Sequence, residues 1–257
     1  MPSASPLIRL ALVALALGVN ALQSTSCISA ARRDKAAGRI TLGTAYLKEG
    51  NVPGAIEKLE EGAKLDRRNW AAWNKLGLAY MAAGAPERAE EAFLKAIDIV
   101  PDEAEALTNY GTFLVRNGRP EEAIPVLTQA AKTLTYRKPA IPLSNLGYAY
   151  HLLDRNTEAL ANLDDAIRRA PNLCQARFMR GIVLDTLDQK PRALEDFEVV
   201  VQLCGEEAAG AYYQAGRLLL EQGQRNDGCS YLLTAVQEGG SSELGRQAST
   251  LHDAECR

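Results

Sequence analysis

The feature of this chain that most constrains its fold is an internal repeat. Six glycines recur along the sequence, each as the second residue of a Leu-Gly pair or of an equivalent pair: Gly43, Gly77, Gly111, Gly147, Gly181 and Gly216. The intervals between them are 34, 34, 36, 34 and 35 residues. A repeat of this length is one supersecondary unit that cannot bury its apolar face alone and must stack on its neighbours. The spacing therefore predicts a stacked array of about six similar units.

The second unit shows the repeat most fully, with the residues Trp73, Leu76, Gly77, Tyr80, Gly84, Ala89, Phe93, Ala96 and Pro101. Gly77 and Ala89 are small where two helices of a hairpin would cross, and Phe93 would fill the space between hairpins. Pro101 ends the second helix because proline cannot donate to the helical ladder. This pattern marks the tetratricopeptide repeat, in which each unit is a pair of antiparallel helices. We therefore predict an all-α, right-handed tetratricopeptide solenoid of about six helix-turn-helix repeats.

The same register gives the expected domain organisation. We place the six repeats within residues 36–240, at 36–69, 70–103, 104–139, 140–173, 174–208 and 209–240. Residues 241–257 should form a capping helix, because the last repeat of a solenoid otherwise leaves an apolar face open. The third repeat has two extra residues, and Pro139 and Pro142 predict a loop at 135–139 that opens the array locally.

The first 26 residues have the layout of an export signal. Arg9 is their only charge, the apolar run at 10–19 is too short to span a bilayer, and small residues lead into Cys27. The site resembles a bacterial lipobox, although Ser24 stands where leucine is usual. Lipidation of Cys27, with 27–35 as a short spacer, would place the protein on the periplasmic face of the outer membrane. The alternative is cleavage by an ordinary signal peptidase.

The other four cysteines can pair among themselves. Cys174 opens the fifth repeat and Cys204 closes it, so the two should meet where antiparallel helices share an edge. Cys229 lies near the start of the last repeat's second helix, and Cys256 ends the cap that should run back along it. We predict the disulfides Cys174–Cys204 and Cys229–Cys256. The alternative is four buried free thiols that act as small apolar fillers.

Composition argues for a binding protein without a cofactor. The formal net charge is −3 with charges of mixed sign, which argues against nucleic acid. The only histidines are His151 and His252, and neither has partners at metal-ligand spacing. We therefore expect no catalytic residue, no metal and no cofactor. A clamp for a peptide carboxylate is also disfavoured, because Ile40, Leu78 and Ile141 occupy inner positions where such clamps carry polar or basic residues.

The layout of a lipoprotein signal, a short spacer and about six repeats resembles the pilotin lipoproteins of type IV pili, the PilF, PilW and Tgl family. Residues 109–118 are similar to the family's third-repeat segment, and residues 136–147 are similar to its extended junction into the fourth repeat. The resemblance is greatest to the members of the Tgl type, which act in social gliding. It implies a protein that is monomeric before binding, and that binds the pilus secretin and promotes its outer-membrane localisation and multimer assembly for twitching or gliding motility. The alternative is a general periplasmic scaffold that docks peptidoglycan enzymes or outer-membrane assembly machinery.

The partner-binding surface should be the concave face lined by the first helix of each repeat. Apolar side chains beside amides suit the capture of an apolar strand or amphipathic helix. The expected groove residues are Asn74, Leu78, Met81, Asn109, Val115, Ile141, Asn145, Tyr148, His151, Phe178, Ile182 and Tyr213, with Ile40, Leu47 and Thr112 beside them. The alternative, equally weighted for each of them, is that the residue packs against a neighbouring helix.

Overall fold

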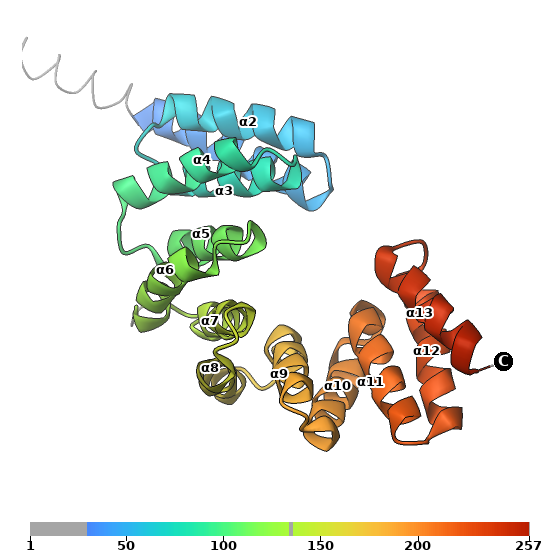
Figure 1. The fold of residues 1–257 in the computed structure, drawn as a ribbon. Coiled ribbons are helices and arrows are strands. Elements are labelled where there is room, and N and C mark those ends of the chain that lie inside the picture. Colours follow the sequence, from blue (N-terminus) through green and yellow to red (C-terminus); the bar gives the residue numbers. More distant parts are fainter. Residues whose placement is uncertain (1–29, 134–135, 257) are drawn as a thin grey trace, which may run out of the picture. The chain divides into compact units, whose positions relative to one another are not determined.

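The computed structural model describes residues 30–133 and 136–256, and every regular element within them is helical (Figure 1). The predicted signal peptide and Cys27 lie outside the described residues. A first helical segment covers residues 30–48. It is followed by α2 (Val52–Leu65), α3 (Trp70–Ala82), α4 (Pro86–Ile99), α5 (Ala104–Arg116), α6 (Pro120–Lys132), α7 (Ala140–Leu152), α8 (Asn156–Arg169), α9 (Cys174–Thr186), α10 (Lys190–Cys204), the 3-10 turn η1 (Gly205–Ala208), α11 (Ala209–Glu221), α12 (Arg225–Gly239) and α13 (Glu243–Glu255).

The helices form two compact units, divided between Pro101 and Asp102. In the first unit α3 packs against both α2 and α4. In the second, α5 pairs with α6, α7 with α8, α9 with α10 and α11 with α12, while α13 packs along α12 (Figure 1). The helices α3, α5, α7, α9 and α11 begin where the sequence register places the second to sixth repeats. The predicted all-helical class is confirmed.

The extended junction between the third and fourth repeats stays packed, contrary to the expectation that it opens the array. Helices α6 and α7 on its two sides remain in extensive contact. The side chain of Tyr136 is half-buried, and Ala140 and Pro142 behind it are buried. The described part of the junction, from Tyr136 on, therefore lies packed within the second unit. The boundary between the units falls instead after the second repeat.

The repeated glycine is explained by one close contact that recurs in every hairpin. A Cβ atom added at Gly77 would lie 2.6 Å from the ring of Phe93, and one added at Gly147 would lie 2.4 Å from Cγ of Leu163. The large residue always stands 16 positions after the glycine. The six pairs are Gly43 with Leu59, Gly77 with Phe93, Gly111 with Leu127, Gly147 with Leu163, Gly181 with Phe197 and Gly216 with Leu232. Each glycine therefore makes room for a large side chain of the facing helix that has no exposed surface.

The turn inside each hairpin also has a fixed residue with positive φ. Glycine occupies it at Gly84, where φ is 67°, and at the corresponding position of four of the six hairpins: Gly50, Gly84, Gly118 and Gly223. In the fourth and fifth repeats the position holds Asp154 and Asp188, both with φ of 57°. Aspartate tolerates this left-handed conformation better than most residues, which keeps the turn in the absence of glycine.

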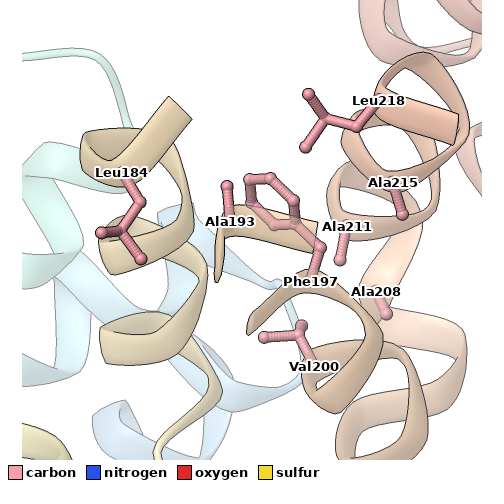
Figure 2. Close-up of a cluster of buried hydrophobic side chains, with 8 residues drawn as sticks. All are labelled: Leu184, Ala193, Phe197, Val200, Ala208, Ala211, Ala215 and Leu218. Atoms are coloured by element: carbon pink, nitrogen blue, oxygen red, sulfur yellow. The ribbon is translucent and has the colours of Figure 1, made fainter. Parts of the chain in front are cut away.

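The core of the fifth and sixth repeats shows how the hairpins stack. Figure 2 shows the cluster, in which buried side chains of α9, α10, η1 and α11 meet: Leu184, Ala193, Phe197, Val200, Ala208, Ala211, Ala215 and Leu218. Phe197 has no exposed surface. The alanines of α11 let this helix approach the ring closely. The stack is thus held by large residues of one helix and small residues of the next.

Two disulfides cross-link helices at the C-terminal end of the second unit. Cys174, at the start of α9, is bonded to Cys204, at the end of α10, with the Cα atoms 6.6 Å apart. Cys229 of α12 is bonded to Cys256 after α13, with a Cα separation of 5.7 Å. These are the pairs that the repeat geometry predicts. Arg225 Nε also donates a hydrogen bond to the carbonyl oxygen of Glu255, at 2.8 Å, which fixes the end of the cap.

Candidate functional site

The first helices of the second unit are joined by a ladder of side-chain hydrogen bonds. Asn145 Nδ2 of α7 donates to Thr112 Oγ1 of α5 at 2.7 Å. Gln175 Nε2 of α9 in turn donates to Asn145 Oδ1 at 3.0 Å. Asn145 is only 5% exposed. The ladder therefore fixes the spacing of three successive first helices, and it brings together two residues of the expected groove and its border, Thr112 and Asn145.

Several expected groove residues pack within the protein, as the alternative interpretation proposed. The ring of Phe178 packs at a tilt against that of Phe197, with centroids 5.7 Å apart, and both Phe178 and Ile182 pack against the core cluster of Figure 2. Val115 is buried, and so is Asn74 in the first unit. These residues lie on the first helices, and their side chains pack mainly within the stack of helices.

The remaining groove residues keep part of their side chains accessible. None of them is fully exposed. In the first unit these half-buried residues are Leu78 and Met81, with Ile40 and Leu47 beside them, and in the second unit they are Asn109, Ile141, Tyr148, His151 and Tyr213. Asn109 has partners within the protein. Ile141, Tyr148 and Tyr213 therefore form the accessible apolar part of the predicted face.

Three polar residues on the same helices were missed by the sequence reasoning. Gln175 is the end of the hydrogen-bond ladder, and Asp185 of α9 forms an ion pair with Arg217 of α11. Arg217 also pairs with Glu221, which pairs with Lys190 at 2.9 Å. All three lie on first helices of their repeats, α9 or α11. The expected groove contained none of them because it was built from apolar side chains beside amides.

A second network joins the fourth and fifth repeats through Arg180, which replaces the leucine of the Leu-Gly pair. Its guanidinium donates to both carboxylate oxygens of Asp196 at 2.7 Å and to Asp164 at 2.7 Å. Asp196 is 2% exposed. These hydrogen bonds, above all the bidentate one to Asp196, raise the pKa of Arg180 and keep it charged. A buried pair of this kind is destabilising to break and therefore holds α9 against α10.

The two histidines are engaged locally. His151 Nδ1 lies 2.9 Å from Asn156 Oδ1, and His252 Nδ1 lies 3.8 Å from Asp253. Across the described ranges, 30–133 and 136–256, no three His, Cys, Asp or Glu side chains come together as ligands for a metal ion. The same ranges contain no helix with the length and hydropathy needed to cross a membrane.

Comparison with known proteins identifies the repeat. One model of the tetratricopeptide repeat matches residues 40–104 and 111–173, and a second matches residues 80–134. The type IV pilus assembly protein PilF of Pseudomonas aeruginosa is 28% identical over 129 residues, which are 50% of this chain and 51% of PilF. The chain thus matches about half the length of this relative.

Three solved structures have a similar fold. A structure from the functional characterisation of Pseudomonas aeruginosa PilF has a TM-score of 0.73 at 23% identity. The match covers 86% of this chain and 99% of the PilF chain. PilW, described as a widely conserved type IV pilus biogenesis factor, has a TM-score of 0.73 at 22% identity and covers 83% and 98%. The Cut9–Hcn1 tetramer of the anaphase-promoting complex has a TM-score of 0.76 at 15% identity and covers 91% and 46%. At these identities the likeness shows the fold alone.

Proposed function

We propose, on the premise that this chain is a tetratricopeptide-repeat protein, that it acts in type IV pilus biogenesis by binding another protein. The observation that carries the proposal is the sequence similarity to PilF, which extends over 129 residues, half of this chain. Arrays of stacked repeats present extended concave binding surfaces. The half-buried Ile141, Tyr148 and Tyr213 and the fixed polar ladder beside them are consistent with such a surface.

The finer proposal concerns the partner. The resemblance to the pilotin family indicates that the protein binds the type IV pilus secretin, helps it reach the outer membrane and promotes its assembly into multimers. The inner face of the second unit suits an apolar strand or amphipathic helix of an unassembled subunit, since it offers apolar side chains between polar groups. Binding there would keep such a segment from aggregating before it inserts. On the same resemblance, the function supports twitching or social gliding, as in the Tgl type.

The anchor is a separate proposal. Lipidation of Cys27 would hold the first repeat close to the periplasmic face of the outer membrane, because only residues 28–35 separate that cysteine from the repeats. Each buried methylene of an acyl chain contributes about 0.8 kcal/mol to membrane binding. Fractionation of a Cys27→Ala variant in cells without the secretin tests this. The variant should leave the outer membrane, and a variant that still follows outer-membrane markers would show that no lipid anchor is needed.

The experiment that tests the function is affinity capture of the full chain from detergent-solubilised membranes, followed by identification of the bound proteins. The secretin should be enriched, and a variant carrying Ile141→Ser and Tyr148→Ser should capture less of it. Peptidoglycan enzymes or outer-membrane assembly proteins in place of the secretin would favour the alternative of a general periplasmic scaffold. The matched control is Leu233→Ser, because Leu233 is an exposed leucine of α12 at 47% exposure.

A further inference from the structure

A groove of about 540 Å³ lies in the first unit, away from the predicted inner face. The second helices α2 and α4 contribute to it, together with the outer side of α3, which packs against both. Its large apolar side chains, Trp73, Leu76 and Tyr80, come from α3, while α2 and α4 each add an alanine. None of the expected groove residues of the inner face lines it. The groove is therefore a second candidate binding surface that the proposed function does not use.

The aromatic rings of this groove are held in place by the protein. Trp73 Nε1 donates a hydrogen bond to the carbonyl oxygen of Arg67 at 3.1 Å, and Lys95 Nζ lies 4.7 Å from the centroid of the Trp73 ring. The guanidinium of Arg88 lies 4.1 Å from the centroid of the Tyr80 ring. A site whose side chains are ordered before binding loses less conformational entropy when a ligand arrives.

The carboxylates of the groove are already engaged. Glu60 accepts a hydrogen bond from the Tyr80 hydroxyl at 2.7 Å and pairs with Arg88 at 2.9 Å. The hydrogen bond from Tyr80 lowers the pKa of Glu60, whereas burial and the bond to Glu60 raise the pKa of Tyr80 to about 12. Glu91 pairs with Lys95 at 2.6 Å. Because both carboxylates are paired with cations, they repel an anionic ligand less than free carboxylates would.

The cations of the groove outnumber these carboxylates. Four basic side chains, Lys64, Arg67, Arg88 and Lys95, line it together with two acidic ones, Glu60 and Glu91. The local excess is thus two positive charges, although the whole chain is net negative. Within the described residues, the exposed Arg67 forms no ion pair with a carboxylate. An anionic ligand would therefore gain both from the local charge and from the unpaired guanidinium.

We propose that this groove binds an acidic segment of a partner protein, with a leucine or aromatic side chain of that segment against Trp73. Charge complementarity selects the acidic chain, and the apolar lining between the basic side chains selects an apolar anchor within it. A recessed groove with rings on its lining fits a peptide better than the flat surface of a bilayer. The protein could then hold one partner on the inner face and a second one here, and this inference does not depend on the identity of the first.

The test measures binding of a fluorescein-labelled heptapeptide to the full chain by fluorescence anisotropy. The peptide carries a central Leu-Phe pair flanked by glutamates, and its isostere has glutamines in their place. We expect saturable binding of the acidic peptide, weaker binding at high salt because exposed charges are screened, and little binding of the isostere. Arg67→Glu should weaken the affinity on the order of tenfold, which corresponds to about 1.4 kcal/mol.

Matched variants separate the groove from general charge effects. Lys48→Glu makes the same change of charge at an exposed residue of the same unit that does not line the groove, and it should leave the affinity within about twofold. Trp73→Leu keeps an apolar side chain but removes the ring, and it should weaken binding without changing the helical circular dichroism. Equal binding of the two peptides, or equal effects of Arg67→Glu and Lys48→Glu, would overturn the proposal. So would binding to phosphatidylglycerol vesicles without binding to the peptide.

Discussion

At the scale of single residues, the contact between a glycine and the large side chain 16 positions later sets the distance between the helices of each hairpin. The contact is so close that even the methyl group of alanine cannot enter without a shift of its neighbour. In the sixth repeat the facing helix α12 also has a glycine, Gly228, at the point where the two helices cross. A Cβ atom at Gly228 would lie 2.9 Å from the carbonyl oxygen of Gly216, so the glycine that replaces the usual alanine permits a closer crossing.

Gly147→Ala should therefore destabilise the protein by about 1–3 kcal/mol, the usual range for overpacking a close-packed core. The added Cβ would meet Cγ of Leu163, which has no exposed surface. Urea unfolding followed by circular dichroism measures the loss. In a background that carries Leu163→Ala the same substitution should cost less, because the clashing atoms are gone. An equal cost in both backgrounds would contradict the contact.

Glu60 gives a pH dependence with a defined sign. The pKa of Glu60 is lowered in the folded protein, mainly by the hydrogen bond from Tyr80. The stability that this group contributes is therefore present above its unfolded pKa, near 4.5, and is lost as the pH falls through the lower folded value.

Relative to Glu60→Gln, the wild type should be more stable at pH 7 by roughly 1 kcal/mol, and this advantage should shrink towards pH 3. Comparison of urea midpoints for both proteins at the two pH values provides the measurement. The other carboxylates are common to both proteins and cancel in the comparison. A stability difference that does not change with pH would mean that Glu60 contributes no such linkage.

At the scale of helices and hairpins, most of the fold follows from local sequence signals. The glycine period fixes the repeat, and proline or asparagine marks the helix starts. Pro86 and Pro120 stand at the first turns of α4 and α6, whereas Asn69 caps α3 by accepting a hydrogen bond from the backbone nitrogen of Ala72 at 3.2 Å. The cysteine pairs could be predicted because, in two antiparallel helices, the start of one helix lies beside the end of the other.

Other features depend on contacts that no periodic signal records. The division after Pro101 was not predictable, because the repeat continues across it with the same spacing. Phe178 stands at an inner position, yet its ring packs on Phe197, which only the crossing geometry of α9 and α10 decides. Arg180 forms ion pairs with Asp164 and Asp196, each 16 residues away, and no charged pair at this spacing belongs to the repeat pattern that the sequence showed.

The disulfide of the last hairpin should stabilise the cap in particular. Cys229 and Cys256 are 27 residues apart, and in the chain-entropy model a loop of this length contributes about 3–4 kcal/mol. In a Cys229→Ser, Cys256→Ser double variant, the amides of α13 should exchange faster with deuterium than in the wild type, whereas those of α3 in the first unit should be unchanged. Unchanged exchange in α13 would show that packing and the Arg225 hydrogen bond suffice to hold the cap.

At the scale of the whole molecule, two compact units of stacked hairpins offer more than one surface. The inner face of the second unit combines accessible apolar residues with a fixed polar ladder, and the groove of the first unit is basic and aromatic. The repeat register predicts which residues face inward, but it could not tell which of them pack against neighbouring helices. It gave no signal for the basic groove, because that surface is assembled from three helices.

The central claim, that the inner face of the second unit promotes assembly of the pilus secretin, is tested most directly by the amount of secretin multimer in outer-membrane fractions. Cells would carry the wild type, the Ile141→Ser, Tyr148→Ser variant, or the exposed-surface control Leu233→Ser, with the fold of each purified protein checked by circular dichroism. Phe178 is left intact because its ring supports the core. The account predicts fewer multimers with the inner-face variant and normal amounts with the control. Normal amounts with a folded inner-face variant would contradict it.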